Sequence, residues 1–217
     1  MKSKILIVAL AAALAVVSAQ LYLAKGDSVK PNNAGGESEA VLNNILSRTS
    51  IREYKNNQPV EKEKVEKMLR AGMAAPTALD TRPWHFVVVD DKNVLKQLAD
   101  AQATNKSAST AALAIAVCGD MDLALEGDNQ EYWIQDCSAA SENILLEAHA
   151  LGLGAVWTST YPSPERQKAV KEILKMPEEI VPLNIIVVGY PAVSPQQKDK
   201  WDETAISYNE YGGMPEE

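Results

Sequence analysis

The chain has 217 residues, of which 46 % are hydrophobic and 23 % charged, a composition typical of one globular domain with a substantial core. These values exclude fibrous, collagen-like and wholly disordered chains. With Lys2 and Lys4 set aside, 19 basic residues face 29 acidic ones, a net charge of −10, which argues against nucleic acid or an anionic membrane as a partner. Two histidines and two cysteines stand at no zinc-site spacing, so we expect no metal site.

Residues 1–19 are predicted to be a secretory signal peptide. Lys2 and Lys4 precede an apolar run over residues 5–17, and Val17-Ser18-Ala19 supplies the small residues of a cleavage site, so we expect cleavage after Ala19. The chain is then exported, with the periplasm as the expected compartment. The alternative is an uncleaved segment that anchors the chain in a membrane, because the apolar stretch continues to residue 24 and a span needs about 20 residues.

A flexible linker is predicted over residues 20–37, where Gly, Asn, Ser and charged residues leave little to bury. The domain is expected to run from residue 38 to residue 209, with a short tail over 210–217. Apolar residues at helical spacing predict two helices at its start. Their apolar stripes are Val41, Leu42, Ile45 and Leu46 in the first helix, and Val65, Met68, Leu69, Gly72 and Met73 in the second.

Three buried-looking apolar runs follow, over residues 85–89, 111–118 and 185–188, and predict core strands separated by helices. The longest helix is expected over residues 132–151, with small residues on one face that allow close approach of another element. Gly152 and Gly154 are predicted to end that helix. A shorter helix should follow Pro164 and end before Pro177, and the polar extension after Pro191 suggests an arm that wraps a partner subunit.

The sequence lacks the motifs of serine hydrolases and P-loop proteins, and Gly152-Leu153-Gly154 lacks the third glycine of a dinucleotide-binding turn. Cys118 lies in an apolar strand and Cys137 on a helix face, which favours buried, inert thiols. A disulfide between them is the main alternative in an oxidising compartment.

Three segments carry groups that could bind a ligand. Arg48, Thr49, Ser50 and Arg52 place two guanidinium groups and two hydroxyls together, a cluster suited to a phosphate. Residues 75–84 form a proline-bounded loop with Thr77, Asp80 and Arg82 directly before a predicted strand. Residues 154–159 lead from a helix end into small and polar residues whose backbone N–H groups could face a ligand. Each segment also fits ordinary surface or turn chemistry.

In chain order, these segments fall into a recognisable series of blocks. The blocks are R-T-S-I-R, A-P-T-A-L-D-T-R-P-W-H-F-V-V-V, I-Q-D-C-S-A-A-S-E-N-I-L-L-E-A-H-A-L-G-L-G-A-V-W-T-S, V-P-L-N-I-I-V-V-G-Y-P-A and K-D-K-W-D-E. Their order and spacing resemble the FMN-dependent nitroreductase family over about residues 38–209. The resemblance implies an α+β fold with a mixed β-sheet wrapped by helices, in an intertwined homodimer with two FMN sites at the interface.

The resemblance also implies roles for individual residues. Arg48 and Ser50, with Lys198 and Lys200 of the C-terminal arm, would hold the FMN phosphate, and Arg52 would lie towards the N1 and O2 edge of the flavin. Thr77, Ala78 and Asp80 of the partner chain would lie against the ring. Thr158 and Ser159 would present backbone N–H groups near N5. No side-chain acid or base is expected, since the flavin carries the chemistry.

The activity that the resemblance implies is transfer of a hydride from NADH or NADPH to FMN and then, by a ping-pong mechanism, to a nitroaromatic, a quinone or a similar small acceptor. Two alternatives are an exported flavin-binding or redox-carrier protein without catalysis, and a specialised flavin reductase such as a dehalogenase. They arise because Asp80 and Arg82 stand where many relatives have Asn and Gln, and because nicotinamide cofactors are scarce outside the cytoplasm. An unpaired carboxylate near a ring that becomes anionic would disfavour its reduction.

Overall fold

The computed structural model of the chain describes residues 34–214, except residues 57 and 195. The predicted signal peptide, residues 20–33 of the predicted linker and residues 215–217 of the predicted tail lie outside this range. The described residues up to Leu42 belong to one compact unit and those from Asn43 onward to a second, which carries the fold. Across the described residues, no helix is both long and apolar enough to span a bilayer.

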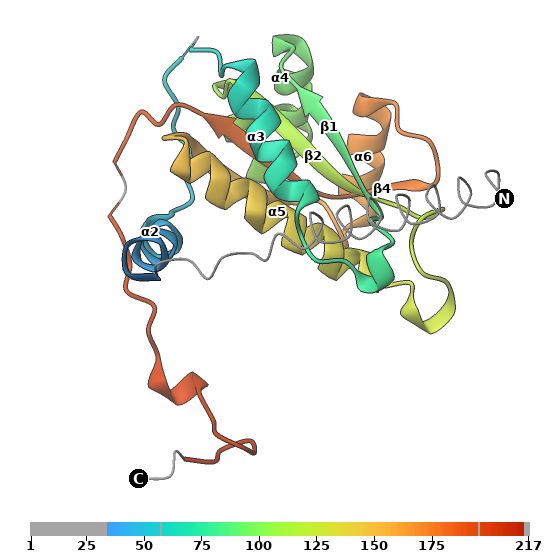
Figure 1. The fold of residues 1–217 in the computed structure, drawn as a ribbon. Coiled ribbons are helices and arrows are strands. Elements are labelled where there is room, and N and C mark those ends of the chain that lie inside the picture. The colour runs from blue at the N-terminus through green and yellow to red at the C-terminus, as the bar shows by residue number, and fades with distance from the viewer. Residues whose placement is uncertain (1–33, 57, 195, 215–217) are drawn as a thin grey trace, which may run out of the picture. The chain divides into compact units, whose positions relative to one another are not determined.

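The described residues form helices and strands in the order shown in Figure 1. The α-helices are α2 (Ala34–Ser47), α3 (Lys62–Met73), α4 (Lys92–Ala101), α5 (Tyr132–Ala150) and α6 (Pro164–Leu174). The strands are β1 (Trp84–Val89), β2 (Leu113–Asp120), β3 (Gly154–Ser159) and β4 (Ile180–Gly189). Short 3-10 helices are η1 (Ala78–Asp80), η2 (Ala103–Ser109), η3 (Gly127–Asn129) and η4 (Glu203–Ala205). Helix α2 begins four residues before the predicted start of the domain, so the end of the predicted linker is helical.

The four described strands form one sheet in the order β1-β2-β4-β3, and all three neighbouring pairs are antiparallel. Ile115 of β2 lies opposite Ile186 of β4, and Val156 of β3 lies opposite Val187 of β4. Among the residues that the structure describes, the one parallel contact is an isolated bridge between Ser50 and Ala155. The predicted α+β class is therefore confirmed. Strand β3 was not predicted.

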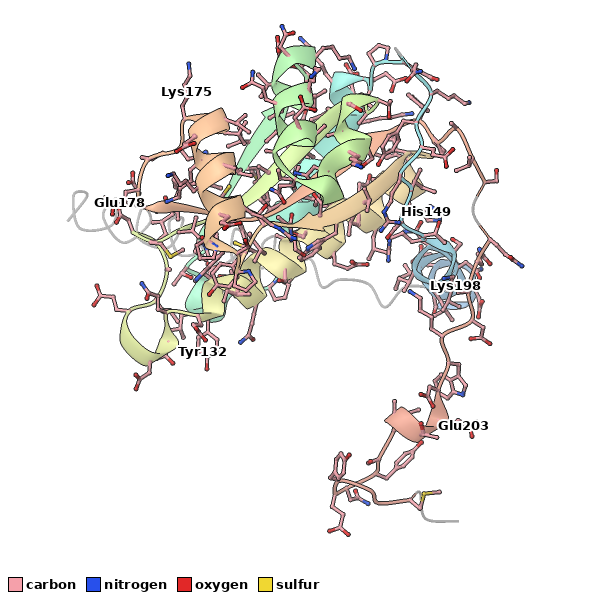
Figure 2. All side chains as sticks on the ribbon, turned by 180° about the vertical axis from the view of Figure 1, so that it is seen from behind. Tyr132, His149, Lys175, Glu178, Lys198 and Glu203 are labelled. Carbon is pink, nitrogen blue, oxygen red and sulfur yellow. The ribbon has the colours of Figure 1, made fainter. Side chains whose placement is uncertain are left out.

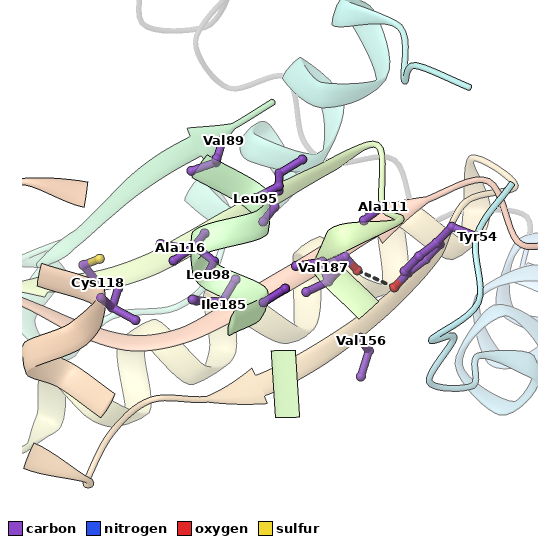
Figure 3. Close-up of a cluster of buried hydrophobic side chains, with 14 of the residues drawn as sticks. Tyr54, Val89, Leu95, Leu98, Ala111, Ala116, Cys118, Val156, Ile185 and Val187 are labelled. Carbon is purple, nitrogen blue, oxygen red and sulfur yellow. Dashed lines mark hydrogen bonds between the residues drawn. The ribbon is translucent and has the colours of Figure 1, made fainter. Parts of the chain in front are cut away.

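Buried side chains pack on both faces of the sheet, because successive residues of a strand point to opposite sides. Ala114, Ala116 and Cys118 of β2 join a cluster with α4 and α6 on one face, part of which Figure 3 shows. Ile115 and Val117 join a second cluster with α3 and α5 on the other face. The sheet therefore lies between two layers of helices (Figure 1).

The two cysteines are free and buried on opposite faces of β2. Cys118 belongs to the cluster under α4 and α6, while Cys137 belongs to the cluster under α5, where its Sγ lies 3.4 Å from the backbone oxygen of Cys118. Burial raises the pKa of the Cys118 thiol to about 12 and also raises the pKa of Cys137. The structure thus buries both thiols, as predicted, and forms no disulfide between them.

Candidate functional site

The segment after α2 is held against the outer edge of the sheet by buried hydrogen bonds. The backbone N–H of Ile51 donates to the backbone oxygen of Ala155 in β3 at 3.0 Å. The hydroxyl of Tyr54 lies 2.7 Å from the backbone oxygen of Ile51 and 3.0 Å from that of Val187, and Figure 3 shows the second contact. Burial raises the pKa of Tyr54, so the hydroxyl stays protonated and can donate. The backbone that carries Arg52 is therefore fixed beside β3, and its exposed side chain extends from there.

Gly154, the first residue of β3, makes this close approach possible. A Cβ atom at Gly154 would lie only 2.6 Å from Cγ2 of Ile51, which real Cβ contacts do not allow. The predicted role of ending α5 belongs to Gly152, whose φ of +74° is the left-handed conformation that favours glycine. Gly154 instead makes room for the segment that carries Arg52.

The hydrogen-bond register of β3 decides which of its N–H groups face outward. The backbone oxygen of Ala155 points away from β4 and accepts from the N–H of Ile51. The backbone N–H of Thr160, just after β3, points towards β4 and donates to the backbone oxygen of Leu183 at 3.0 Å. Because backbone groups alternate along an edge strand, Ser159 directs its N–H away from β4 and Thr158 directs its N–H towards it. The buried Thr158 hydroxyl also bonds to β4, 2.8 Å from the backbone oxygen of Ile185. Ser159 is thus the outward donor of the predicted Thr158 and Ser159 pair.

A cavity of about 280 Å³ lies at this edge. Its lining residues are Arg52, Trp157, Thr158, Ser159 and Arg166. Two of the three polar groups of Ser159 are engaged: Nε1 of Trp157 lies 3.1 Å from its Oγ, and Nη1 of Arg166 donates to its backbone oxygen at 3.2 Å. No carboxylate lines the cavity, and across the described residues neither arginine forms an ion pair. The structure thus brings together Arg52, Thr158 and Ser159.

A second, larger cavity of about 670 Å³ contains none of the predicted site residues. It lies between α3 and the β1–β2 edge and is lined mainly by apolar side chains, including Val65, Leu69, Val88 and Leu113. Size alone therefore does not identify the site here. The smaller cavity has the convergent polar groups that small-molecule sites require.

Arg48, Thr49 and Ser50 precede Arg52 on the same segment. Nε of Arg48 lies 3.4 Å from Oε1 of Glu142 on α5, and the Arg48 side chain is 19 % exposed. Nearby, Nε2 of His149 lies 2.7 Å from Oγ of Ser47. Burial, and to a lesser extent the charge of Arg48, lower the pKa of His149. The Ser50 backbone is tied to β3 by the bridge to Ala155, while Ser50 itself is exposed.

Lys198 and Lys200 lie on the C-terminal arm, on which Figure 2 labels Lys198 and Glu203. Both lysines are exposed. Among the described residues, neither lysine forms an ion pair. Their part in the predicted phosphate cluster stays a prediction.

The loop with Thr77, Ala78 and Asp80 is anchored by a residue that the sequence did not reveal. Buried Asp136 on α5 accepts hydrogen bonds from Oγ1 of Thr77 at 3.1 Å and from the backbone N–H of Ala78 at 3.0 Å. Beyond this anchor, Leu79, Asp80 and Arg82 all have positive φ values, between +50° and +58°. Such a conformation is unfavourable for these residue types, so the surrounding contacts must stabilise it.

Within one chain, the loop and Arg48 contact different parts of α5. The loop is bound by Asp136 near the start of the helix, whereas Arg48 pairs with Glu142 six residues later. Ser47 contacts His149 near the helix end, and Figure 2 labels Tyr132 and His149 at the two ends. Six residues of α-helix correspond to about 9 Å along the helix axis, so the loop and Arg48 contact α5 almost two turns apart.

Comparison with known sequences identifies the family. The sequence model of the nitroreductase family matches residues 45–120 and 104–190. A protein of Methanothermobacter thermautotrophicus, provisionally named NADH dehydrogenase/NAD(P)H nitroreductase, is 41 % identical over 167 residues, which are 76 % of this chain and 85 % of that protein. The chain belongs to the nitroreductase family.

Solved structures of other nitroreductases share the fold. A structure from Bacteroides thetaiotaomicron with the same provisional name matches with a TM-score of 0.74 and 49 % identity, over 79 % of this chain and 98 % of that one. An FMN-dependent nitroreductase from Clostridium difficile matches with a TM-score of 0.71 and 31 % identity, over 78 % and 99 % of the two chains. The residues matched by the family model include the Arg48 to Arg52 segment, the Thr77–Arg82 loop and β3.

Proposed function

We propose that this nitroreductase is an FMN-dependent oxidoreductase that takes hydride from NADH or NADPH and passes electrons to a nitroaromatic, quinone or similar small acceptor by a ping-pong mechanism. The observation that carries the proposal is the cavity at β3, where Arg52 and the outward N–H of Ser159 converge without a neighbouring carboxylate. The names of the relatives support the same cofactor and reductant.

The donors at this cavity fit a flavin, which presents nitrogen and oxygen acceptors at N1 and O2 and a further acceptor at N5. The N1 and O2 edge gains negative charge when the ring is reduced. Guanidinium groups and backbone N–H groups are hydrogen-bond donors, and a guanidinium adds the matching charge. Arg48, Thr49 and Ser50, on the same segment as Arg52, supply donors for the phosphate at the other end of FMN.

Bound FMN supplies the hydride chemistry. The residues of this chain bind and orient it: Tyr54 and Gly154 hold the segment of Arg52 in place, and Trp157 fixes the Ser159 side chain. None of these contacts requires a side-chain acid or base, and we assign none. Initial rates at varied NAD(P)H and acceptor concentrations test the mechanism. Parallel double-reciprocal lines are expected, and intersecting lines would contradict the ping-pong scheme.

We further propose that each site is shared between two copies in a homodimer. In support, the loop and Arg48 contact α5 at Asp136 and Glu142, about 9 Å apart along the helix, and the Asp80 and Arg82 side chains of the loop are exposed and so available to a partner's site. The arm after β4 leaves large side chains exposed, including Trp201, Tyr208 and Tyr211, as expected for a segment that packs on a partner.

Truncation of the arm tests this dimer proposal. A chain that ends at Ser194 loses Lys198 and Lys200 and should lose FMN and the dimer together. Light scattering and flavin absorbance measure both properties. A flavin-saturated monomer formed by residues 20–217 would contradict the proposal.

We propose, from the predicted signal peptide over residues 1–19, that the chain is exported. N-terminal sequencing of the protein recovered from cell fractions tests it. A mature N-terminus at Gln20 in the periplasmic fraction is expected. Recovery of the intact leader in the membrane fraction would instead support the anchored alternative.

Two other functions are candidates. One is a flavin-binding or electron-carrier protein without catalytic turnover, and the other is a specialised flavin reductase such as a dehalogenase. The observation that favours them is the ion pair of Asp80 and Arg82, which replaces the Asn and Gln of many relatives on the loop proposed to face the ring. A panel of nitroaromatic, quinone and halogenated acceptors offered to the reduced protein distinguishes these functions.

A further inference from the structure

Arg166 lies at the cavity beside β3 although no sequence motif marked it. It sits in the first turn of α6, where the Ser163 side chain caps the helix by accepting from the Arg166 backbone N–H at 3.4 Å. From there the half-buried side chain reaches back to β3, and its Nη1 donates to the backbone oxygen of Ser159 at 3.2 Å. The cap thus fixes the start of the helix that directs Arg166 towards the cavity.

The charges at the cavity are all of one sign. Arg52 comes from the segment after α2 and Arg166 from α6, and they are the only charged residues among those that line the cavity. Within the described residues, the ion pairs of α6 involve Lys168 and Glu172, not Arg166. Two guanidinium groups at one cavity without a carboxylate repel each other and favour a ligand that carries, or acquires, negative charge.

We propose that Arg166 is a second cationic residue of the flavin site, which positions Ser159 and favours the reduced, anionic form of the cofactor. The inference rests on the proposed function and extends it to a residue that neither the sequence motifs nor the family resemblance assigned. By holding the Ser159 backbone oxygen, Arg166 fixes the edge of β3 from which the Ser159 N–H points outward. Its positive charge lies on the same cavity as Arg52.

The charge balance of the first half-reaction explains why a guanidinium near the ring should bind reduced FMN more tightly than oxidised FMN. Hydride transfer oxidises NAD(P)H to NAD(P)⁺ and delivers two electrons and one proton to a ring that is neutral when oxidised. The reduced ring then carries one negative charge. A nearby guanidinium therefore stabilises reduced FMN more than oxidised FMN, and its removal should weaken the binding of the reduced form selectively.

Variants of the FMN-bound protein test this selectivity. Arg166→Gln should change the dissociation constant of oxidised FMN by less than about threefold but weaken binding of reduced FMN about tenfold, which lowers the midpoint potential by about 30 mV for a two-electron couple. Arg166→Lys keeps the charge and should recover part of the potential. Lys168→Gln removes a charge from an exposed position on the same helix and should leave the potential unchanged.

The outcomes separate this inference from the proposed function. Equal weakening of oxidised and reduced FMN in Arg166→Gln would show a merely structural role and overturn the inference, as would an unchanged potential. If the unmodified protein binds no FMN, the proposed function itself fails. If it binds FMN and only the Arg166 result is negative, the proposed function stands and the role of Arg166 does not.

Discussion

Asp80 and Arg82 are bound to each other by a forked ion pair. Nε of Arg82 lies 2.7 Å from Oδ1 of Asp80, and Nη2 lies 2.5 Å from Oδ2. Hydrogen bonds from Arg82 hold the pKa of the Asp80 carboxyl below its ordinary value, and the same contacts raise the pKa of Arg82. Asp80 is therefore ionised at neutral pH, and the neighbouring guanidinium offsets its charge.

This pair predicts opposite shifts in flavin potential for two single substitutions. Asp80→Asn leaves Arg82 unopposed and should raise the midpoint potential of bound FMN, whereas Arg82→Gln leaves the carboxylate unopposed and should lower it, each by roughly tens of millivolts. Spectroelectrochemical titration of the three proteins measures the shifts. If both variants keep the original potential, the loop does not lie against the flavin.

Arg48→Ala should weaken FMN binding. Loss of one charge-assisted contact to phosphate costs about 1.5–3 kcal/mol, which corresponds to roughly a tenfold to hundredfold higher dissociation constant. Titration of the apo-protein with FMN measures this dissociation constant. Arg70→Ala is a matched control, because Arg70 is an exposed arginine paired with Glu66 on α3. Equal affinities in the Arg48 variant and the control would remove Arg48 from the site.

Gly154→Ala should displace the segment that carries Arg52. The added methyl group would overlap Ile51, so the protein should lose about 1–3 kcal/mol of unfolding free energy and also bind FMN more weakly. Gly152→Ala is the control, since it strains a left-handed position that has no neighbour within 4 Å. Thermal unfolding should show a loss of stability in both variants, whereas FMN titration should show weaker binding only in Gly154→Ala. Normal FMN affinity in Gly154→Ala would contradict the proposed packing.

The two thiols should resist alkylation in the native protein. Because the Cys118 pKa is about 12 and that of Cys137 is also raised, almost no thiolate exists at pH 8, and both side chains are buried. Mass spectrometry after iodoacetamide treatment should show no adduct in native protein and two adducts after denaturation. Rapid native labelling, or an oxidised form that carries an intramolecular disulfide, would refute this packing.

The core strands could be predicted from the sequence because β1, β2 and β4 are continuous apolar runs. Strand β3 could not, since it begins with a glycine, ends in Thr158 and Ser159, and follows directly on a helix end. Its strand character comes from pairing with β4, a contact distant in sequence. The mixed sheet expected from the resemblance is, in the described strands, antiparallel with one isolated parallel bridge.

The site was only partly predictable for a similar reason. Arg52, Thr158 and Ser159 fall in recognisable blocks, and the structure brings them to one cavity. Asp136 and Arg166 are single charged residues on helices, a pattern that also describes any solvated helix face. Their contacts with the Thr77 loop and with Ser159 exist only in the folded chain.

Anaerobic addition of NADH or NADPH to the FMN-bound protein tests directly whether it is an NAD(P)H oxidoreductase. We expect the flavin absorbance near 450 nm to bleach with about one equivalent of reductant per FMN and to return when a quinone or nitroaromatic is added. Bound FMN that stays oxidised with either nucleotide, yet is reduced by dithionite, would contradict the proposed NAD(P)H oxidoreductase.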